Sequence, residues 1–396
     1  MIIKYSIIIP TRNRAEYLPY AIKSVLNTNR KDIELIVSDN HSTDDTQDKL
    51  QYIKDNRLKV IKPPITLPMA AHYEYVLKHA RGSWITIIGD DDAIMPYFYE
   101  RLDHYIEKYS EIEIISSSRA YYFWKGSEHL YGGCVINYLS SNKCKIRSTK
   151  QDLKAVLQGR RSCFDMPQIY TTCIIKRSLY EEIKNKSNGI FYHSIIPDMY
   201  SVVAICLSRD NYLRIDEPLF WVGTSSKSLG ISDRIYKDAS KFVQHKNEGY
   251  DWVTTHISDL ISYEIHSGAF SPIYIFECLL KTPLKNKMGT IKQSREWVYA
   301  AVLSQLSFKR HSNKRKVIHK ICKEIFLYKL NKTKLCVHLV FNCVFLFITA
   351  LYTLSAKVAK SCKLNADYIY LRSSNRHKYD NIAKASIGIE HERKQY

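Results

Sequence analysis

The sequence predicts an α/β protein with a mostly parallel sheet flanked by helices and a helical C-terminal extension. Short Ile- and Val-rich runs alternate with amphipathic segments along the first third, and polar residues follow the runs. At 396 residues the chain is long enough for one large core with additions. We expect a main domain over residues 1–225, a basic helical region over 226–334, and an apolar helix with a polar tail over 335–396.

The first third changes repeatedly between the strand period and the helix period. Short apolar runs predict buried strands, and apolar residues three or four positions apart predict helices between them. The predicted strands are Tyr5–Pro10, Ile33–Asp39, Leu58–Lys62 and Trp84–Gly89, and the predicted helices are Glu16–Asn27, a segment from Ser42 through Ile53, and Met69–Ala80. This β–α order predicts parallel strands whose carboxyl ends meet at one rim, where such sheets bind ligands.

Polar side chains follow three of the four predicted strands. The stretches are PTRNR from residue 10, DNHSTDD from residue 39 and GDDD from residue 89. A solvated loop, a helix cap or an acidic turn would explain each stretch alone, but their meeting at one rim indicates a ligand site. Adjacent carboxylates repel one another, so in a chain of net charge +20 we expect positive charge to join them.

These motifs resemble those of glycosyltransferase family 2, which has a GT-A, Rossmann-like fold. The resemblance is carried by SIIIPTRNRAEYLPYAIKSVL, IELIVSDNHSTDDT and ARGSWITIIGDDDAIMP, and it extends over roughly the first 225 residues. It implies an inverting transferase that moves a sugar from a nucleoside-diphosphate sugar to an acceptor hydroxyl. A UDP-sugar is the leading donor, with TDP- and GDP-sugars open. No G-x-G-x-x-G follows the first strand, which argues against a dehydrogenase.

The resemblance also implies donor-binding roles at the first two strand ends. Arg12 or Arg14 is expected near phosphate, and Asp39 is expected to accept a hydrogen bond from the base or ribose. The full set expected to line the donor site is Pro10, Thr11, Arg12, Asn13, Arg14, Asp39 and Asp90.

The aspartate run is the expected metal site. Mn²⁺ or Mg²⁺ prefers carboxylate oxygens and would stabilise the charge of the leaving diphosphate. Asp91 is expected to ligate the cation directly and Asp92 to support the site or hold a metal-bound water, while Asp90 faces the ribose or phosphate side. Many family members have an aspartate where this chain has Gly89, so the distribution of roles within the run stays open.

Asp198 is the expected general base. It opens an apolar helical run after Pro197, and the family commonly places its catalytic carboxylate at such a position. An aspartate at a helix start is also an ordinary cap. His193 is the weaker alternative base, and residues 225–227 either close over the diphosphate or form a solvated loop.

The segment LCVHLVFNCVFLFITALYTLS, residues 335–355, is long enough to span a bilayer, but His338 and Asn342 are unfavourable in hydrocarbon. A helix on the membrane surface, a single span and a buried core helix all remain open, and the basic clusters on both sides favour an anionic inner leaflet. We therefore expect a cytoplasmic enzyme, peripheral on the inner face of the cell membrane. Its acceptor would be a glycan or lipid-linked glycan of a bacterial surface polysaccharide.

Other function classes fit the sequence less well. Lys+Arg 59 against Asp+Glu 39 also fits a nucleic-acid-binding protein, but no such module is recognisable and we expect no nucleic-acid partner. A GT-A-like nucleotide-binding protein without transferase activity is the other alternative, and Asp91 and Asp198 argue against it. Ten cysteines without a C-x-x-C pair are typical of reduced cytoplasmic thiols. The tail after Asp367 is expected to be loosely held.

Overall fold

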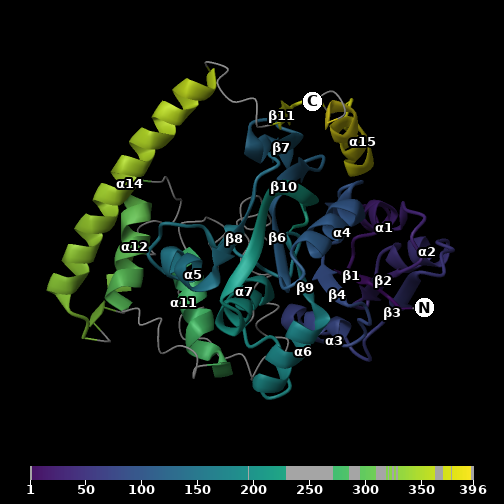
Figure 1. The fold of residues 1–396 in the computed structure, drawn as a ribbon, viewed down its shortest axis with the longest axis horizontal. Helices are drawn as coiled ribbons and strands as arrows, with labels where there is room; N and C mark the ends of the chain where they lie inside the picture. The colour runs from purple at the N-terminus through teal and green to yellow at the C-terminus, as the bar shows by residue number, and fades with distance from the viewer. Residues whose placement is uncertain are drawn as a thin grey trace.

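Strands from both ends of the chain meet in one sheet (Figure 1). The computed structural model describes residues 2–194, 196–228, 271–284, 295–308, 318–319, 321–322, 325–326, 329–361, 369–375 and 377–393. The strands are β1 (Tyr5–Thr11), β2 (Ile33–Asp39), β3 (Leu58–Ile61), β4 (Trp84–Ile87), β5 (Ala93–Ile94), β6 (Ile114–Phe123), β7 (Ile136–Ser140), β8 (Cys144–Ser148), β9 (Cys173–Lys176), β10 (Asn211–Thr224) and β11 (Ile369–Ser373). The helices are α1 (Leu18–Leu26), α2 (Thr46–Gln51), α3 (Met69–Leu77), α4 (Phe98–Lys108), α5 (Thr149–Leu157), α6 (Arg177–Lys186), α7 (Pro197–Ser208), α11 (Ser271–Lys281), α12 (Arg295–Phe308), α14 (Lys332–Ser361) and α15 (Ile382–Arg393), with 3-10 turns η1 (Glu128–Tyr131) and η2 (Cys163–Asp165).

The first four strands form the predicted parallel unit. They lie in the order β3-β2-β1-β4, and the pairings of β1 with β2 and β4, and of β2 with β3, are parallel. Thr11 at the end of β1 is in register with Asp39 at the end of β2, which brings the first two polar stretches together. The α/β fold class is thereby confirmed.

Side chains of β1 point alternately to the two faces of the sheet, and helices cover both faces. All seven residues of β1 are buried, as expected for a strand covered on both sides. Ile7 and Ile9 belong to the core shared with α1 and α4, whereas Ile8 belongs to the core shared with α3 and α7. α1 begins at Leu18, because Glu16 and Tyr17 belong to a turn.

Beyond β4 the sheet becomes mixed. β9 pairs antiparallel with β4 and β6, while β10 runs parallel to β6 and antiparallel to β5 and β8. Trp221 of β10 lies opposite Ala93 of β5, directly after the aspartate run. β10 therefore delivers its last residues to the same rim as the polar ends of β1 and β2.

The C-terminal tail is part of this core, so the prediction of a loosely held tail is wrong. β11 pairs antiparallel with β7, and α15 lies near α1 (Figure 1). Tyr379, Ile382 and Ile389 are at most 1% exposed. The Trp221 indole Nε1 donates a hydrogen bond to the Ser386 hydroxyl at 2.9 Å. A few apolar residues at helical spacing hold an otherwise polar segment in place.

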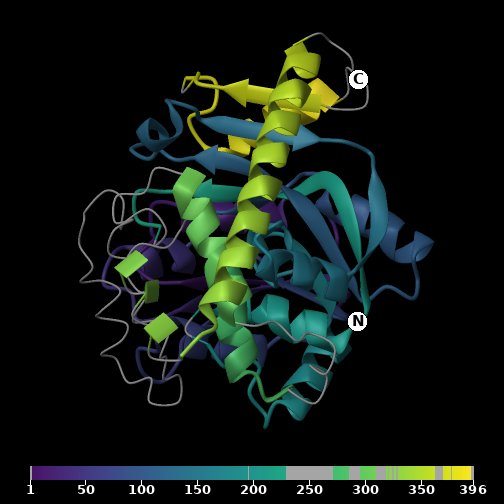
Figure 2. The ribbon, with the colours of Figure 1, turned by 90° about the vertical axis from the view of Figure 1, so that its left-hand side faces the viewer.

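Helix α14 lies beside α12 at the edge of the molecule (Figures 1 and 2). Its side toward α12 carries Asn342, which is 3% exposed, and His338, whose ring lies 4.3 Å from that of Trp297. The two polar residues that argued against hydrocarbon therefore face protein. Within the described residues, no helix combines the length and apolar character needed to cross a membrane.

The predicted helical region 226–334 is described only in part. It contains α11 and α12, which are helical as expected. Residues 229–270, 285–294 and most of the basic cluster 309–320 lie outside the described residues, so the predicted domain boundaries stay predictions.

Candidate active site

The loops after β1 and β2 are joined by direct hydrogen bonds. The backbone N–H of Asn13 donates to the Ser42 hydroxyl at 2.9 Å, and the Asn13 side-chain oxygen accepts from the Thr43 N–H at 2.7 Å. Asn13 has a φ of 57°, a left-handed conformation that asparagine adopts more readily than most residues. Its short side chain thus fixes the two polar stretches against each other.

Asp39 is buried at the end of β2, where both its oxygens already accept hydrogen bonds. The Ser42 N–H donates to Oδ1 and the Gln47 amide donates to Oδ2, each at 3.0 Å. The neighbouring Asn40 side chain makes two bonds to the backbone of Leu67. These contacts set the position of Asp39, and its predicted role toward a nucleotide stays a prediction.

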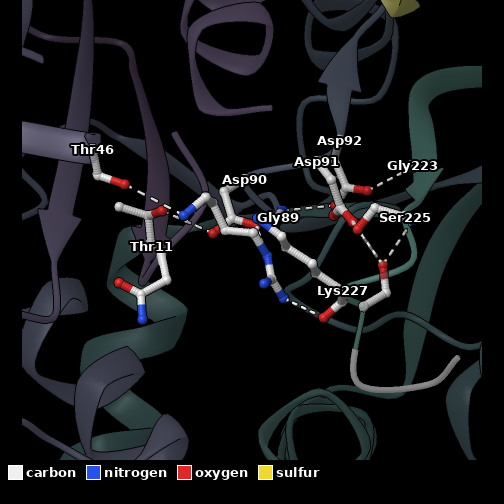
Figure 3. Close-up of polar contacts among 12 residues, drawn as sticks. Thr11, Thr46, Gly89, Asp90, Asp91, Asp92, Gly223, Ser225 and Lys227 are labelled. Atoms are coloured by element: carbon white, nitrogen blue, oxygen red, sulfur yellow. Dashed lines mark hydrogen bonds and ion pairs between the residues drawn. The ribbon is translucent and has the colours of Figure 1, made fainter. Parts of the chain in front are cut away.

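Asp90 connects the aspartate run to the end of β1 (Figure 3). The Thr11 hydroxyl donates to Asp90 Oδ2 at 2.8 Å, and Arg14 Nε lies 3.4 Å from Oδ1. Arg14 also donates to the carbonyl of Lys227 at 2.5 Å, so it links β1 to the segment after β10. Burial alone would lower the pKa of Arg14, but Asp90 and Asp91 outweigh this effect and raise it. The sequence predicts Arg12 or Arg14 near phosphate, and this role stays a prediction, since the structure shows Arg14 beside the aspartates.

Asp91 is held by hydroxyls from the end of β10. The Ser225 and Ser228 hydroxyls donate to the same oxygen, Oδ2, at 2.7 and 2.6 Å, and within the described residues Oδ1 carries no hydrogen bond. Asp91 is 7% exposed, and its backbone carbonyl accepts from the Trp124 indole at 2.9 Å. Ser225 was singled out in the sequence as a possible closing residue, and it contacts the aspartate run directly.

Asp92 is held by backbone N–H groups on both sides, from Gly223 and Gly89 (Figure 3). Its Oδ1 accepts from the Gly223 N–H at 2.7 Å, and its Oδ2 accepts from the Gly89 N–H at 2.7 Å and from the Thr171 hydroxyl. Since both oxygens have protein donors, the geometry favours the supporting role for Asp92 over contact with a cation.

Burial and mutual repulsion shape the charges of the run. Burial raises the pKa of Asp90 to about 6, with Arg14 opposing and Asp91 adding to the shift. Burial and then the charge of Asp91 raise the pKa of Asp92 to about 8. Three ionised carboxylates are thus unfavourable here without a cation, as the sequence suggested.

The fit of a divalent cation rests on Asp91. Asp91 has an oxygen without a protein donor, and the run repels itself, both of which suit a cation. The described residues contain no group of three or more His, Cys, Asp or Glu side chains arranged to hold a metal. A cation at this rim would therefore need further oxygens, which the diphosphate of a nucleotide would offer.

Asp198 lies in the first turn of α7 and is half-buried. Burial raises the pKa of its carboxyl, while the backbone N–H of Met199 and the charge of Arg119 act to lower it. Asp198 raises the pKa of the Tyr73 hydroxyl, as do Asp90 and Asp92, although burial has the largest effect on that hydroxyl. Tyr73 therefore lies within electrostatic reach of both Asp198 and the aspartate run.

His193, the alternative base, is occupied elsewhere. Its Nε2 lies 3.1 Å from the carbonyl oxygen of Ile190 and 3.2 Å from that of Ser187, and its ring packs against Tyr200. These contacts are those of a residue that fixes a loop.

Sequence reasoning missed several side chains of this site. They come from segments without a recognisable local motif, and spatial proximity alone reveals them: Tyr73, Arg119, Trp124, Tyr170, Thr171 and Ser228.

Polar side chains at the carboxyl ends of parallel strands are typical of α/β proteins that bind a ligand at this edge of the sheet. Residues 6–183 match the model of the family described as Glycosyl transferase family 2. This part of the chain belongs to glycosyltransferase family 2, and the family prediction is confirmed.

Two relatives illustrate the similarity. The GalNAc(5)-diNAcBac-PP-undecaprenol beta-1,3-glucosyltransferase of Campylobacter jejuni is 32% identical over 136 residues, which cover 34% of this chain and 38% of the relative. The UDP-Glc:alpha-D-GlcNAc-diphosphoundecaprenol beta-1,3-glucosyltransferase WfaP of Escherichia coli is 33% identical over 102 residues, 26% of this chain and 41% of the relative. The chain thus matches about two fifths of the length of each.

Among solved structures, S. aureus TarS in complex with UDP-GlcNAc is 16% identical, with a TM-score of 0.48. The likeness covers 83% of this chain and 93% of that chain.

Proposed function

We propose that this protein is an inverting glycosyltransferase that moves a sugar from a nucleoside-diphosphate sugar to a hydroxyl of a lipid-linked glycan. The observation that supports the proposal is that Asp198 and the aspartate run both act electrostatically on Tyr73, which comes from α3, a helix that packs against α7. A single displacement needs the leaving diphosphate on one side of the sugar and the base on the other. This arrangement can supply both.

The relatives support the donor and acceptor classes. The name of WfaP specifies UDP-Glc as donor and a diphosphoundecaprenol-linked sugar as acceptor, and the Campylobacter jejuni enzyme is also named for an undecaprenol-linked glycan. We take a UDP-sugar as the leading donor, and surface polysaccharide assembly as the setting.

Each residue at the rim has a distinct task in this proposal. Thr11 and Arg14 hold Asp90 in place beside the phosphates, while Asp91 offers a carboxylate oxygen for Mn²⁺ or Mg²⁺. A bound cation would stabilise the negative charge of the leaving diphosphate. Asp92 ties β4 to β10 and so maintains the shape of the rim.

Asp198 takes the proton of the acceptor hydroxyl while the acceptor oxygen bonds to the anomeric carbon and the bond to the diphosphate breaks. Its pKa, raised by burial, makes it a stronger base than an exposed carboxylate. Because the base acts only when ionised, activity should fall as pH decreases through this raised pKa.

A lipid-linked acceptor fits the exposed face of α14. Six large apolar side chains of this helix are at least half exposed, namely Val337, Val340, Phe341, Val344, Phe347 and Ile348. Lys332 and Lys334 at its start are exposed as well, which suits an anionic surface. We propose that this face lies on the cytoplasmic leaflet of the membrane.

The experiment that tests the function combines a donor panel with Asp198→Asn. Purified protein is supplied with UDP-glucose, UDP-N-acetylglucosamine, UDP-galactose or GDP-mannose and a lipid-diphosphate sugar, with Mn²⁺ or with EDTA. We expect transfer from one donor, lost in EDTA. Asp198→Asn should lower kcat about 10²- to 10⁴-fold while UDP affinity stays within a few-fold, since asparagine cannot accept the proton.

Asp48→Asn is the matched control, because Asp48 also lies in the first turn of a helix, is exposed, and is not part of the rim. It should leave kcat unchanged. If Asp198→Asn keeps normal turnover and Tm, then Asp198 is only a cap, for which asparagine is as good. If no donor yields transfer while UDP still binds, the protein is a nucleotide-binding protein without transferase activity.

A further inference from the structure

Two tyrosines that no motif pointed to lie together at the rim. Tyr73 comes from α3, and Tyr170 comes from the loop between η2 and β9. Their rings are stacked, with centroids 6.1 Å apart and an interplanar angle of 23°. Tyr192 packs edge-on against Tyr73 and is buried, whereas both stacked tyrosines remain half-buried. Part of the stacked pair can therefore be reached from outside.

The pair lies beside the aspartate run and within electrostatic reach of Asp198. Burial has the largest effect on the pKa of each hydroxyl, and carboxylates raise both further. Asp198 and Asp90 act on Tyr73, while Asp92 acts on Tyr170.

Gly89 explains how Tyr170 reaches the aspartate run. A Cβ atom at this position would lie 2.6 Å from the Tyr170 hydroxyl oxygen and 2.7 Å from Asp92 Oδ2, both closer than real contacts allow. The hydroxyl of Tyr170 therefore occupies the space that a side chain at position 89 would need. The position of the Tyr170 hydroxyl thus depends on the absence of a side chain at residue 89.

The backbone next to Tyr170 is strained, and two contacts hold it. Thr171 has a φ of 47°, which is rare for a β-branched residue. Its N–H donates to the carbonyl of Ile87 in β4 at 2.8 Å, and its hydroxyl donates to Asp92. The loop is thus fastened to the strand that carries the aspartates, and Tyr170 has a fixed place beside Gly89.

We propose that Tyr170, with Tyr73 stacked beside it, binds the sugar of the nucleotide-sugar donor, and that the Tyr170 hydroxyl selects among donors by a hydrogen bond to a sugar hydroxyl. The sugar must lie between the diphosphate and the base, and the pair contacts the aspartate run while Tyr73 is within electrostatic reach of Asp198. Aromatic rings offer an apolar surface with a polar tip, which suits a sugar ring with hydroxyls at its edge. This inference rests on the proposed function and names its specificity-determining residue.

The test separates binding of the sugar from binding of the nucleotide. Tyr170→Phe keeps the ring and removes only the hydroxyl. Calorimetric titration with UDP and with UDP-glucose should show unchanged UDP affinity and about tenfold weaker UDP-glucose affinity, the effect of one lost hydrogen bond. The ratio of kcat/KM between UDP-glucose and UDP-galactose, which differ in one hydroxyl configuration, should also move toward one.

Tyr75→Phe is the matched control, because Tyr75 is on the same helix as Tyr73 but its hydroxyl donates to the Lys62 carbonyl at 3.0 Å, away from the rim. It should change neither affinity. Equal loss of UDP and UDP-glucose binding in Tyr170→Phe would make Tyr170 a merely structural residue and overturn the proposal. The proposal would also be overturned if Tyr170→Phe discriminated between UDP-glucose and UDP-galactose as strongly as the wild type does. The proposed function itself fails only if wild-type protein transfers no sugar.

The contact between Tyr170 and Gly89 can be tested by thermal stability, without an activity assay. Gly89→Ala should lower Tm, because the added methyl group meets Tyr170 and Asp92. The same change in the Tyr170→Phe background should cost less, since one of the two close contacts is gone. An equal cost in both backgrounds would show that the hydroxyl does not lie beside Gly89, and the proposal would then lose its geometric basis.

Discussion

Helix α14 and the tail of β11 and α15 follow one another in the chain, but they differ in how much of their apolar surface is exposed to solvent. α14 is rich in apolar residues, and much of its apolar surface is exposed. The tail is polar in composition, yet Tyr379, Ile382 and Ile389 are almost fully buried. Average hydropathy would have assigned these two segments the other way round.

The difference shows that a few well-spaced residues decide burial. In α15 the buried side chains Ile382, Ala385 and Ile389 are three and four positions apart, so they form one stripe that faces the core of the first domain. In α14 apolar residues surround the helix, and only the side with His338 and Asn342 meets α12. An apolar helix with one covered side has a surface left for another partner.

The largest expected effect tests the docked tail. Ile389→Ala should lower the free energy of unfolding by about 2–5 kcal/mol, because it leaves a cavity in the core. Ile387→Ala, in the same helix but at a position that is 66% exposed, should change it by less than about 0.5 kcal/mol. Denaturant unfolding of both variants measures the difference. Equal small effects would mean that the tail is not packed in solution.

An intermediate effect tests the exposed face of α14. Val340→Glu combined with Val344→Glu should weaken sedimentation with vesicles of mixed phosphatidylglycerol and phosphatidylcholine at least about tenfold, because apolar contact is replaced by like charge. Ile65→Glu with Ile146→Glu is the matched control, since both isoleucines are exposed but lie elsewhere. Unchanged sedimentation of the α14 variant would remove this face from the membrane.

The smallest effect concerns the covered side of α14. Asn342 is buried, and within the described residues its amide nitrogen and oxygen have no hydrogen-bond partner. Asn342→Leu should raise the free energy of unfolding by about 1 kcal/mol, because an unsatisfied polar group is replaced by an apolar one of similar size. Cys343→Ala, at a half-buried neighbour, serves as the comparison. A clear loss of stability would mean that the amide is bonded in solution.

The same contrast explains which parts of the molecule the sequence could predict. Strands β1 to β4 and the polar rim follow local rules, because a β–α unit carries its period and its polar end within about 30 residues. The sequence therefore predicts Thr11, Asp39 and Asp90 at one rim, and the structure brings them together there. Tyr170 was not, because its place beside Gly89 depends on a loop that reaches the site from a distant part of the chain.

The tail was missed for a related reason. Its anchors, such as the bond from Trp221 to Ser386 across 165 positions, join segments that carry no shared pattern. The mixed half of the sheet could not be predicted either. The hydrophobic pattern of β9 does not indicate that its antiparallel partner is β4. The prediction of Asp198 as the base, far beyond the first four strands, depended on the family resemblance alone.

The bond between Trp221 and Ser386 also has a consequence for how the protein is made. During synthesis the N-terminal part of a chain can fold first. Here the Trp221 indole, two residues before the Gly223 N–H that holds Asp92, receives its partner only after residue 386 has left the ribosome. The packing around the end of β10 is therefore completed late, and a premature stop codon before residue 369 would leave β7 with an open edge.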